Sequence, residues 1–251
     1  MKIGIFAADE IGLKIVSLFS KLNKEIMFLI LDEKENNDLN DQIKSTARCE
    51  NIFFYKDLSK VGVLKFLKSL NIDLIILAWW PYIIKQPLLD ISRMGFLNTH
   101  PSLLPYNRGK HYYFWNIVEE VPFGVTLHWI DDNIDSGDIA FQKELNTTWE
   151  DTGFTLRKRG REAMVTLFEE SIDAIISGNI PRKKQDLKER RFRLAKEIDG
   201  SSKIDLERLY TAKEILNSIR ARSGFPFGGA WFEDGDEKYE VTLSIKKVTD
   251  E

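Results

Sequence analysis

The sequence predicts an α/β fold, in which a mostly parallel sheet has flanking helices and is followed by a small helix-plus-β C-terminal segment. Three observations support this prediction. Short apolar runs alternate with stretches whose apolar residues recur at helical spacing. The segment at residues 72–80 is apolar enough to be buried on both faces, as the strands of parallel sheets are. After residue 180 the pattern changes to a basic stretch, a helix and an alternating strand.

The elements of the sheet follow one another in the first part of the chain. Residues 2–7 form an apolar run that ends in polar residues, and the apolar residues from Ile11 to Phe19 then recur at helical spacing. A long helical pattern over residues 152–177 is closed by Gly178 and Pro181. The predicted strands cover residues 2–7, 26–31, 51–55, 72–80, 95–99 and 124–130, and further helices cover 61–70 and 88–91. This alternation predicts a Rossmann-like arrangement.

Two parts are expected in the chain. Residues 1–180 form the predicted N-terminal domain, and residues 181–251 form a linker and a small C-terminal helix and β segment. The basic stretch from Arg182 to Arg193 is interpreted as a linker or an exposed arm. A helix is predicted over residues 206–222 and a strand over 239–248. Because an exposed alternating strand can pair with a second chain, we expect a homodimer.

Composition excludes several classes of function. The 251 residues have a formal net charge of -3, so the global basic field of a protein that binds nucleic acid is missing. The single cysteine, Cys49, cannot form an internal disulfide or a multi-cysteine metal site. Neither a signal peptide nor a membrane-spanning stretch is found in the sequence. We therefore expect a cytoplasmic protein without nucleic-acid or membrane partners.

Polar residues gather between residues 95 and 138. Asn98 and His100 alternate where an apolar strand ends, so both side chains are expected on one face at the carboxyl edge of the sheet. An amide beside an imidazole suits the stabilisation of an oxyanion. The alternative is a structural role, because amides and histidines often cap strand ends.

Four aspartates crowd the loop after the strand at residues 124–130. They could bind a hard cation, but their spacing and single glycine do not match a calcium loop. The alternative is that one carboxylate faces the cleft and perturbs His100 while the others are solvated turn residues. We predict that Asp135 is that carboxylate and that no metal binds. The four residues are Asp131, Asp132, Asp135 and Asp138.

A family resemblance becomes specific at these residues. Three segments carry the resemblance: the motif Asn98-x-His100-x-Ser102-Leu103-Leu104-Pro105, the pair Arg108-Gly109 and the segment GVTLHWIDDNIDSGD. They resemble the formyltransferases that use 10-formyltetrahydrofolate, most of all the nucleotide-sugar N-formyltransferases. The resemblance implies direct attack of an amine on the formyl carbon, with Asn98, His100 and Asp135 as the catalytic residues. Asp135 would hold His100 in the state that donates to the oxyanion, or would relay a proton from the attacking amine to the departing tetrahydrofolate nitrogen. The matching His128 would have a supporting role.

The resemblance also implies N10-formyltetrahydrofolate as co-substrate. The family lays the pterin in an apolar slot beside the segment at residues 78–83, so Trp80, Tyr82 and Ile83 are candidates, together with Asp132. Aromatic and branched residues at the end of a buried strand are equally consistent with plain core packing.

The expected formyl acceptor is the amine of a nucleotide-linked amino-deoxysugar, with dTDP as the expected nucleotide, such as a 4-amino-4,6-dideoxyglucose used for surface polysaccharides. Asp9 and Glu10 occupy the first helix N-terminus, where they would oppose the phosphate of glycinamide ribonucleotide. The short segment after Ser223 and the acidic balance disfavour tRNA. Cations and aromatic rings suited to a pyrophosphate and a sugar follow the catalytic loop at Arg108, Gly109, Lys110, Tyr113 and Trp115.

Two alternatives stay open. The chain could be a methionyl-tRNA formyltransferase-like enzyme, or a formyl-folate binding protein that transfers nothing. Near the end of the chain, Phe225, Phe227 and Trp231 could stack on a base, but they could equally form a small core or a contact between subunits.

Overall fold

The computed structural model describes residues 1–186, 188, 192–225 and 228–248. The chain divides into two compact units, which are described separately. Unit 1 comprises Met1–His100, Thr126–Gln142 and Met164–Gln185, and unit 2 comprises Pro101–Val125, Lys143–Ala163 and Asp186–Glu251. The two units are defined by contacts between residues, and each combines three separate segments of the chain. The domain boundary expected between residues 180 and 181 therefore stays a prediction.

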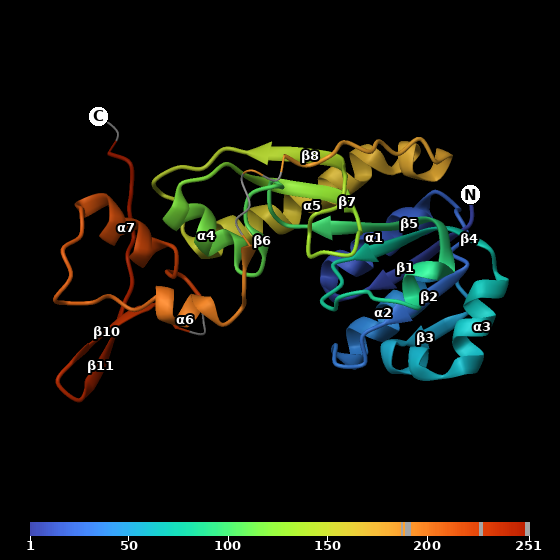
Figure 1. Ribbon diagram of the computed structural model, residues 1–251, viewed down its shortest axis with the longest axis horizontal. Helices are drawn as coiled ribbons and strands as arrows, with labels where there is room; N and C mark the ends of the chain where they lie inside the picture. Colours follow the sequence, from blue (N-terminus) through green and yellow to red (C-terminus); the bar gives the residue numbers. More distant parts are fainter. Residues whose placement is uncertain (187, 189–191, 226–227, 249–251) are drawn as a thin grey trace. The chain divides into compact units, whose positions relative to one another are not determined.

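Unit 1 is built on a seven-stranded sheet, which confirms the predicted α/β class (Figure 1). The strand order is β3-β2-β1-β4-β5-β7-β8; the pairs from β3 to β5 are parallel, and β5 is antiparallel to β7. The last two strands continue into residues of unit 2. The strands are β1 (Ile3–Ala7), β2 (Phe28–Leu31), β3 (Ile52–Phe54), β4 (Ile72–Ala78), β5 (Ser92–His100), β7 (Phe123–Trp129) and β8 (Ile139–Leu145).

Helices cover both faces of this sheet. On one face, residues of α3 (Val61–Ser69) join a core with Phe6, Phe28 and Phe96. Gly4 makes room there, because a Cβ at this position would lie 2.3 Å from the Phe28 ring. On the other face, Phe19 and Phe168 bring α1 and the second half of α5 together, with ring centroids 6.3 Å apart. The helices of unit 1 include α1 (Asp9–Lys21), α2 (Asn37–Ala47), η1 (Tyr55–Ser59), η2 (Leu88–Ile91) and part of α5 (Gly153–Ser177).

Unit 2 has its own hydrophobic core. Residues of α4 (Tyr112–Glu119) pack with Leu156, Ile198 and Phe225. The two-residue strands β6 (Arg108–Gly109) and β9 (Phe192–Arg193) are parallel, and β10 (Ala230–Asp234) and β11 (Glu237–Val241) form an antiparallel hairpin. The remaining helices are α6 (Glu197–Ser201) and α7 (Ala212–Arg220). Of the helices in the described ranges, none has both the length and the apolarity needed to span a bilayer.

Some boundaries in the second half of the chain differ from the prediction. Helix α7 begins at Ala212 instead of residue 206, because Thr211 and Glu214 form a capping box at its N-terminus. Leu209 lies outside it and is 95% exposed. Strand β11 ends at Val241 rather than residue 248, because its partner β10 begins at Ala230, which pairs with Val241.

Candidate active site

Three polar side chains meet where β5 and β7 pair. Asn98 lies directly opposite His128, and His100 lies opposite Thr126, in the antiparallel register of the two strands. Side chains at alternate positions of a strand share a face, so Asn98, His100 and His128 all lie on one face of the sheet. His100 is 5% exposed and His128 is fully buried, whereas Asn98 is half-buried. The predicted proximity of Asn98 and His100 is therefore found in the structure.

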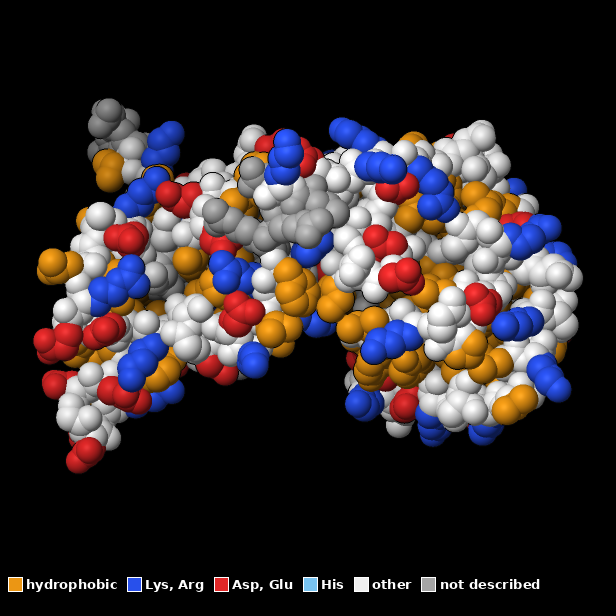
Figure 2. Space-filling model, in the orientation of Figure 1, with side chains coloured by type: hydrophobic (Ala, Val, Ile, Leu, Met, Phe, Trp, Pro, Cys, Tyr) orange, Lys and Arg blue, Asp and Glu red, His pale blue; other side chains and the backbone are white. Residues whose placement is uncertain are grey.

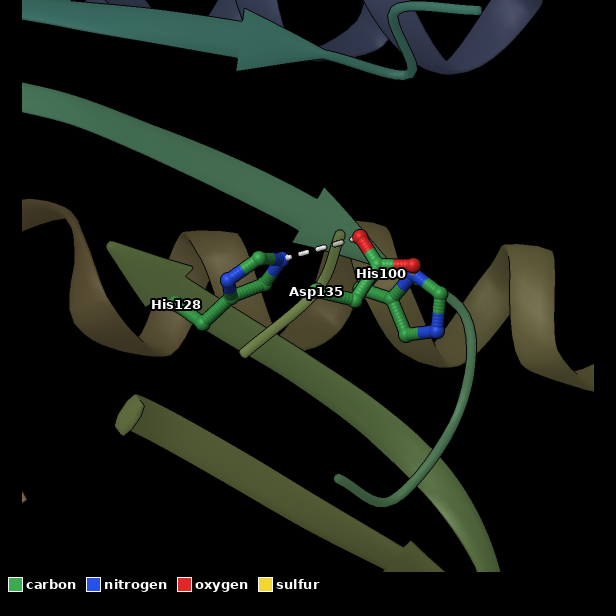
Figure 3. Close-up of side chains that lie close together, drawn as sticks. All are labelled: His100, His128 and Asp135. Carbon is green, nitrogen blue, oxygen red and sulfur yellow. Dashed lines mark ion pairs between the residues drawn. The ribbon is translucent and has the colours of Figure 1, made fainter. Parts of the chain in front are cut away.

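Asp135 completes this cluster from the loop that connects β7 to β8. Its carboxylate lies between the two imidazole rings (Figure 3), with Oδ2 at 3.5 Å from Nδ1 of His100 and Oδ1 at 3.6 Å from Nε2 of His128. Its side chain is 13% exposed. All four residues of the cluster belong to unit 1. The arrangement brings amide, imidazole and carboxylate groups together, which are the groups that acyl-transfer chemistry uses.

The Asp135 loop is held in place by groups outside the cluster. Gln185 donates its side-chain amide hydrogens to the carbonyl oxygens of Asp135, at 3.0 Å, and Gly137, at 2.7 Å. A Cβ at Gly137 would lie 1.9 Å from the Trp129 carbonyl oxygen, so only glycine fits there. Asp135 itself has a φ of 51°, which aspartate tolerates better than most residues. Sequence reasoning missed Gln185, which lies in the stretch interpreted as a linker or exposed arm and has no distinguishing motif.

Hydrogen bonds determine the protonation of His128. Nδ1 lies 2.9 Å from the carbonyl oxygen of Trp129, and a carbonyl can only accept, so Nδ1 carries the proton. Nε2 is then an acceptor, and it lies 3.0 Å from the amide nitrogen of Asn98. Burial lowers the pKa of His128 to about 4, against the opposing effect of the Asp135 carboxylate. His128 is therefore neutral at physiological pH.

His100, His128 and Asp135 also have the side-chain types that bind metal ions. Ligand atoms of His100, His128 and Asp135 lie within 4.8 Å of one another. However, the Nε2 lone pair of His128 already accepts the Asn98 amide, so a metal ion would have to displace that hydrogen bond. Asp131 accepts hydrogen bonds from Ser136, and both Asp131 and Asp132 are exposed. The predicted absence of a metal stays a prediction.

The candidate co-substrate residues of unit 1 differ in burial. Trp80 is 8% exposed and packs edge-on against Phe6, with ring centroids 5.2 Å apart. Tyr82 stacks on Tyr55 at 4.8 Å, and its hydroxyl donates to the Asp32 carboxylate. Ile83 is 57% exposed.

A hollow of about 550 Å³ opens beside this loop. Tyr82 and Ile83 line it, together with Tyr55, and Lys34, Lys56 and Lys85 supply positive charge. Burial and the neighbouring Asp32 carboxylate raise the pKa of Tyr82 to about 12, so its hydroxyl stays protonated and donating. Trp80 does not line this hollow, and its place in the core matches the packing alternative.

The first helix N-terminus is acidic, as the sequence indicates. Asp9 and Glu10 both lie in the first turn of α1. The backbone amide of Asp9 donates to Oε2 of Glu35 at 2.9 Å, so a third carboxylate already occupies this end of the helix. These charges oppose the binding of a phosphate group there.

The candidate acceptor-binding residues all belong to unit 2. Arg108 and Gly109 form β6, and a Cβ at Gly109 would lie 2.3 Å from the carbonyl oxygen of Arg193. Lys110 is exposed. Tyr113 and Trp115 are buried in the core of unit 2 at 6% and 4% exposure. Their burial favours a packing role over direct binding.

The aromatic residues near the end of the chain are also in unit 2. Phe225 belongs to the same core. Lys238 lies over the ring of Trp231, 3.8 Å from its centroid. Phe227, the third of these aromatic residues, lies outside the described residues.

Comparison with known proteins shows two family matches. The model described as formyl transferase matches residues 18–172. The model described as an N-formyltransferase dimerization C-terminal domain matches residues 197–247. Among curated relatives, the methionyl-tRNA formyltransferase of Thermotoga maritima is 30% identical over 213 residues, which cover 83% of this chain and 67% of that enzyme.

Solved structures share the fold over most or nearly all of the chain. A 4-N formyltransferase from Francisella tularensis has a TM-score of 0.80 at 22% identity and covers 98% of both chains. An N-formyltransferase from Helicobacter canadensis, solved in complex with folinic acid and dTDP-3-aminofucose, has a TM-score of 0.69 at 22% identity; the match covers 88% of this chain and 80% of that one.

Proposed function

Since the chain belongs to the formyl transferase family, whose members use formyl-tetrahydrofolate, we propose that it transfers the formyl group of N10-formyltetrahydrofolate to the amine of a nucleotide-linked amino-deoxysugar. The observation on which this proposal mainly rests is the cluster of Asn98, His100 and Asp135 at the ends of β5 and β7. A dTDP-linked 4-amino-4,6-dideoxyglucose, a precursor of surface polysaccharide, is the acceptor that we favour.

The cluster suits direct transfer through a tetrahedral intermediate. The amine nitrogen forms a bond to the formyl carbon, and the carbonyl oxygen becomes an oxyanion. The amide of Asn98 and the imidazole of His100 donate hydrogen bonds to that oxygen, the kind of contact whose loss costs about 3 to 4 kcal/mol in other enzymes. The bond from the carbon to N10 of the folate then breaks. The amine loses one proton and N10 gains one, and Asp135 relays that proton, directly or through water.

The hollow beside Tyr82 and Ile83 supports a place for the folate in unit 1. The stacked rings of Tyr55 and Tyr82 line it together with apolar side chains such as Leu64, and Glu33 lines it beside the lysines. A concave site that combines apolar and aromatic side chains with polar groups is typical of small-molecule binding. We propose that the pterin lies beside residues 82 and 83, and that Trp80 supports the slot from the core. The exposed Asp132 would then contact the co-substrate from the loop of Asp135.

Three observations support a sugar acceptor. Residues 197–247 match a C-terminal domain of N-formyltransferases. The Helicobacter relative was solved with a dTDP-linked aminosugar. On the face shown in Figure 2, basic and acidic side chains are interspersed rather than gathered into a basic surface of the kind that tRNA requires.

A second candidate acceptor is methionyl-tRNA. It is favoured by the identity of 30% to the Thermotoga enzyme, although that match spans only 67% of the enzyme. The two candidates are separated by supplying a dTDP-aminosugar and charged initiator tRNA in one reaction with limiting 10-formyltetrahydrofolate. Mass spectrometry of the acceptors is expected to find a formamido sugar and unmodified tRNA. Formylated methionine with unmodified sugar would overturn the choice of acceptor.

A further inference from the structure

We propose that His128 is a positioning residue that orients the amide of Asn98 for the oxyanion by accepting one of its two hydrogens. The inference rests on the proposed function, because it assigns a role to His128 only if Asn98 stabilises the oxyanion. In the proposed chemistry, His128 does not itself contact the reacting atoms.

The orientation of an asparagine side chain decides whether it can serve an oxyanion. The amide can rotate by half a turn about its last bond, which exchanges a donating nitrogen for an accepting oxygen. An oxygen turned toward an oxyanion would repel it. A site that uses asparagine as a donor therefore needs a neighbour that distinguishes the two ends of the amide.

His128 makes that distinction. Its Nδ1–H donates to the Trp129 carbonyl at 2.9 Å, which leaves Nε2 as an acceptor facing the Asn98 nitrogen at 3.0 Å. If the amide were reversed, its oxygen would face the Nε2 lone pair, and two acceptors would meet in a buried place. The nitrogen of Asn98 has two hydrogens, and His128 uses only one. The second is available for the oxyanion.

The surroundings hold His128 in this neutral form. The residue is fully buried and directly opposite Asn98 in the register of β5 and β7. The charged or titratable groups that face it are Asp135 and His100, with Asp131 farther along the loop. Asp135 favours a proton on the ring, but burial has the larger effect and opposes it. Protonation of Nε2 would remove the acceptor and release the Asn98 amide.

The tautomer can be observed directly in the intact protein. Long-range proton–nitrogen NMR of the protein with labelled histidine should show His128 as neutral and protonated on Nδ1 at neutral pH. His128→Leu identifies its signals. A proton on Nε2 at neutral pH would overturn the proposal, because that nitrogen could not then accept from Asn98. This readout does not depend on catalytic activity.

A double-mutant cycle tests whether His128 acts through Asn98. We expect His128→Leu to lower kcat about ten-fold with little change in KM, and to have no further effect when Asn98 is already alanine. A purely structural role would lower kcat by the same factor in both backgrounds and would overturn the proposal. If Asn98→Ala alone leaves kcat unchanged, the proposed function of the site fails instead, so the two failures are distinguishable.

Discussion

The carboxylate of Asp135 lies 3.5 Å from Nδ1 of His100, slightly beyond the usual length of a hydrogen bond. Both groups are largely buried, and Asp135 is on a loop whereas His100 ends a strand. Contacts between catalytic groups are often long without substrate and tighten when it binds. The small gap is therefore compatible with a pair that closes around the reacting groups.

Replacing Asp135 by asparagine tests this relationship. The amide keeps the size of the side chain but removes the negative charge and the capacity to take up a proton. We expect kcat to fall by about 100-fold or more, as is typical when a group that transfers a proton is removed. Single-turnover kinetics measure this loss. Asp173→Asn, on the exposed side of α5, is the matched control and should leave kcat unchanged. A wild-type kcat in Asp135→Asn would contradict the assignment.

Asn98→Ala tests stabilisation of the oxyanion. Loss of one donor of this kind lowers kcat by about 100- to 1,000-fold, while ground-state binding changes little. Rapid-mixing kinetics under single-turnover conditions isolate the chemical step. Asn116 is a matched buried asparagine, whose amide donates to the carbonyl oxygen of Val121. Asn116→Ala should lower the melting temperature yet keep the rate of the chemical step. Equal rate losses in the two variants would indicate that Asn98 is merely structural.

Gln185→Ala should affect catalysis from outside the cluster. It removes both hydrogen bonds to the Asp135 loop, and small misplacements of reacting groups are costly, so we expect kcat to fall roughly ten-fold. Gln142→Ala is the control, since Gln142 donates to Thr126 instead of this loop. Stopped-flow kinetics and melting temperatures separate the two effects. Unchanged kcat in Gln185→Ala would show that the loop does not need this support.

The pH dependence of stability follows from His128. Burial lowers its pKa from 6.5 to about 4, so in acid the unfolded chain binds a proton that the folded protein resists. Stability should therefore fall as pH drops from about 6.5 to about 4, with up to about 3 kcal/mol from this residue. Urea unfolding of wild type and His128→Leu at several pH values measures the difference. The two proteins should lose stability at different rates in that window, and parallel curves would contradict the buried neutral state.

Association of two chains is expected from the C-terminal segment. Residues 197–247 match a domain described as a dimerization domain, and Tyr239 of the β10–β11 hairpin is 41% exposed. Sedimentation equilibrium should give twice the 29.2 kDa of one chain. Tyr239→Asp places a charge on the hairpin and should shift the mass toward that of one chain. A wild-type mass equal to one chain would contradict the expected homodimer.

Six strands of the sheet were predicted from runs rich in apolar residues. Strand β8 was missed, because its sequence IAFQKEL is not a continuous apolar run. In the second unit, the C-terminal helix and β segment were predicted, although with other boundaries. The short helix at Leu88–Ile91 and the strand that ends in Asn98 and His100 follow directly from local pattern. Helix α4 was missed because its aromatic residues were interpreted as ligand contacts, yet Tyr113 and Trp115 lie in a core. Burial of an aromatic ring depends on what packs against it, which spacing alone does not reveal.

The candidate site, too, could be predicted only in part from the spacing of residues in the sequence. Asn98 and His100 are two residues apart, so their common face follows from strand geometry. Asp135 was predicted among four aspartates as the carboxylate that faces the cleft, and the family resemblance then implied its catalytic role. The part played by Gln185 was not predictable, because its hydrogen bonds join residues 50 and 48 positions apart and amide side chains are common on surfaces.

The central claim is that this cluster transfers a formyl group to an aminosugar. The most direct test follows the release of tetrahydrofolate from 10-formyltetrahydrofolate with a panel of dTDP- and UDP-aminosugars, glycinamide ribonucleotide and charged initiator tRNA. We predict turnover with a dTDP-aminosugar, dependence on its amine, and a loss of at least about 100-fold in Asn98→Ala and His100→Ala. Folate binding without transfer to any amine, or transfer unaffected by either substitution, would contradict it.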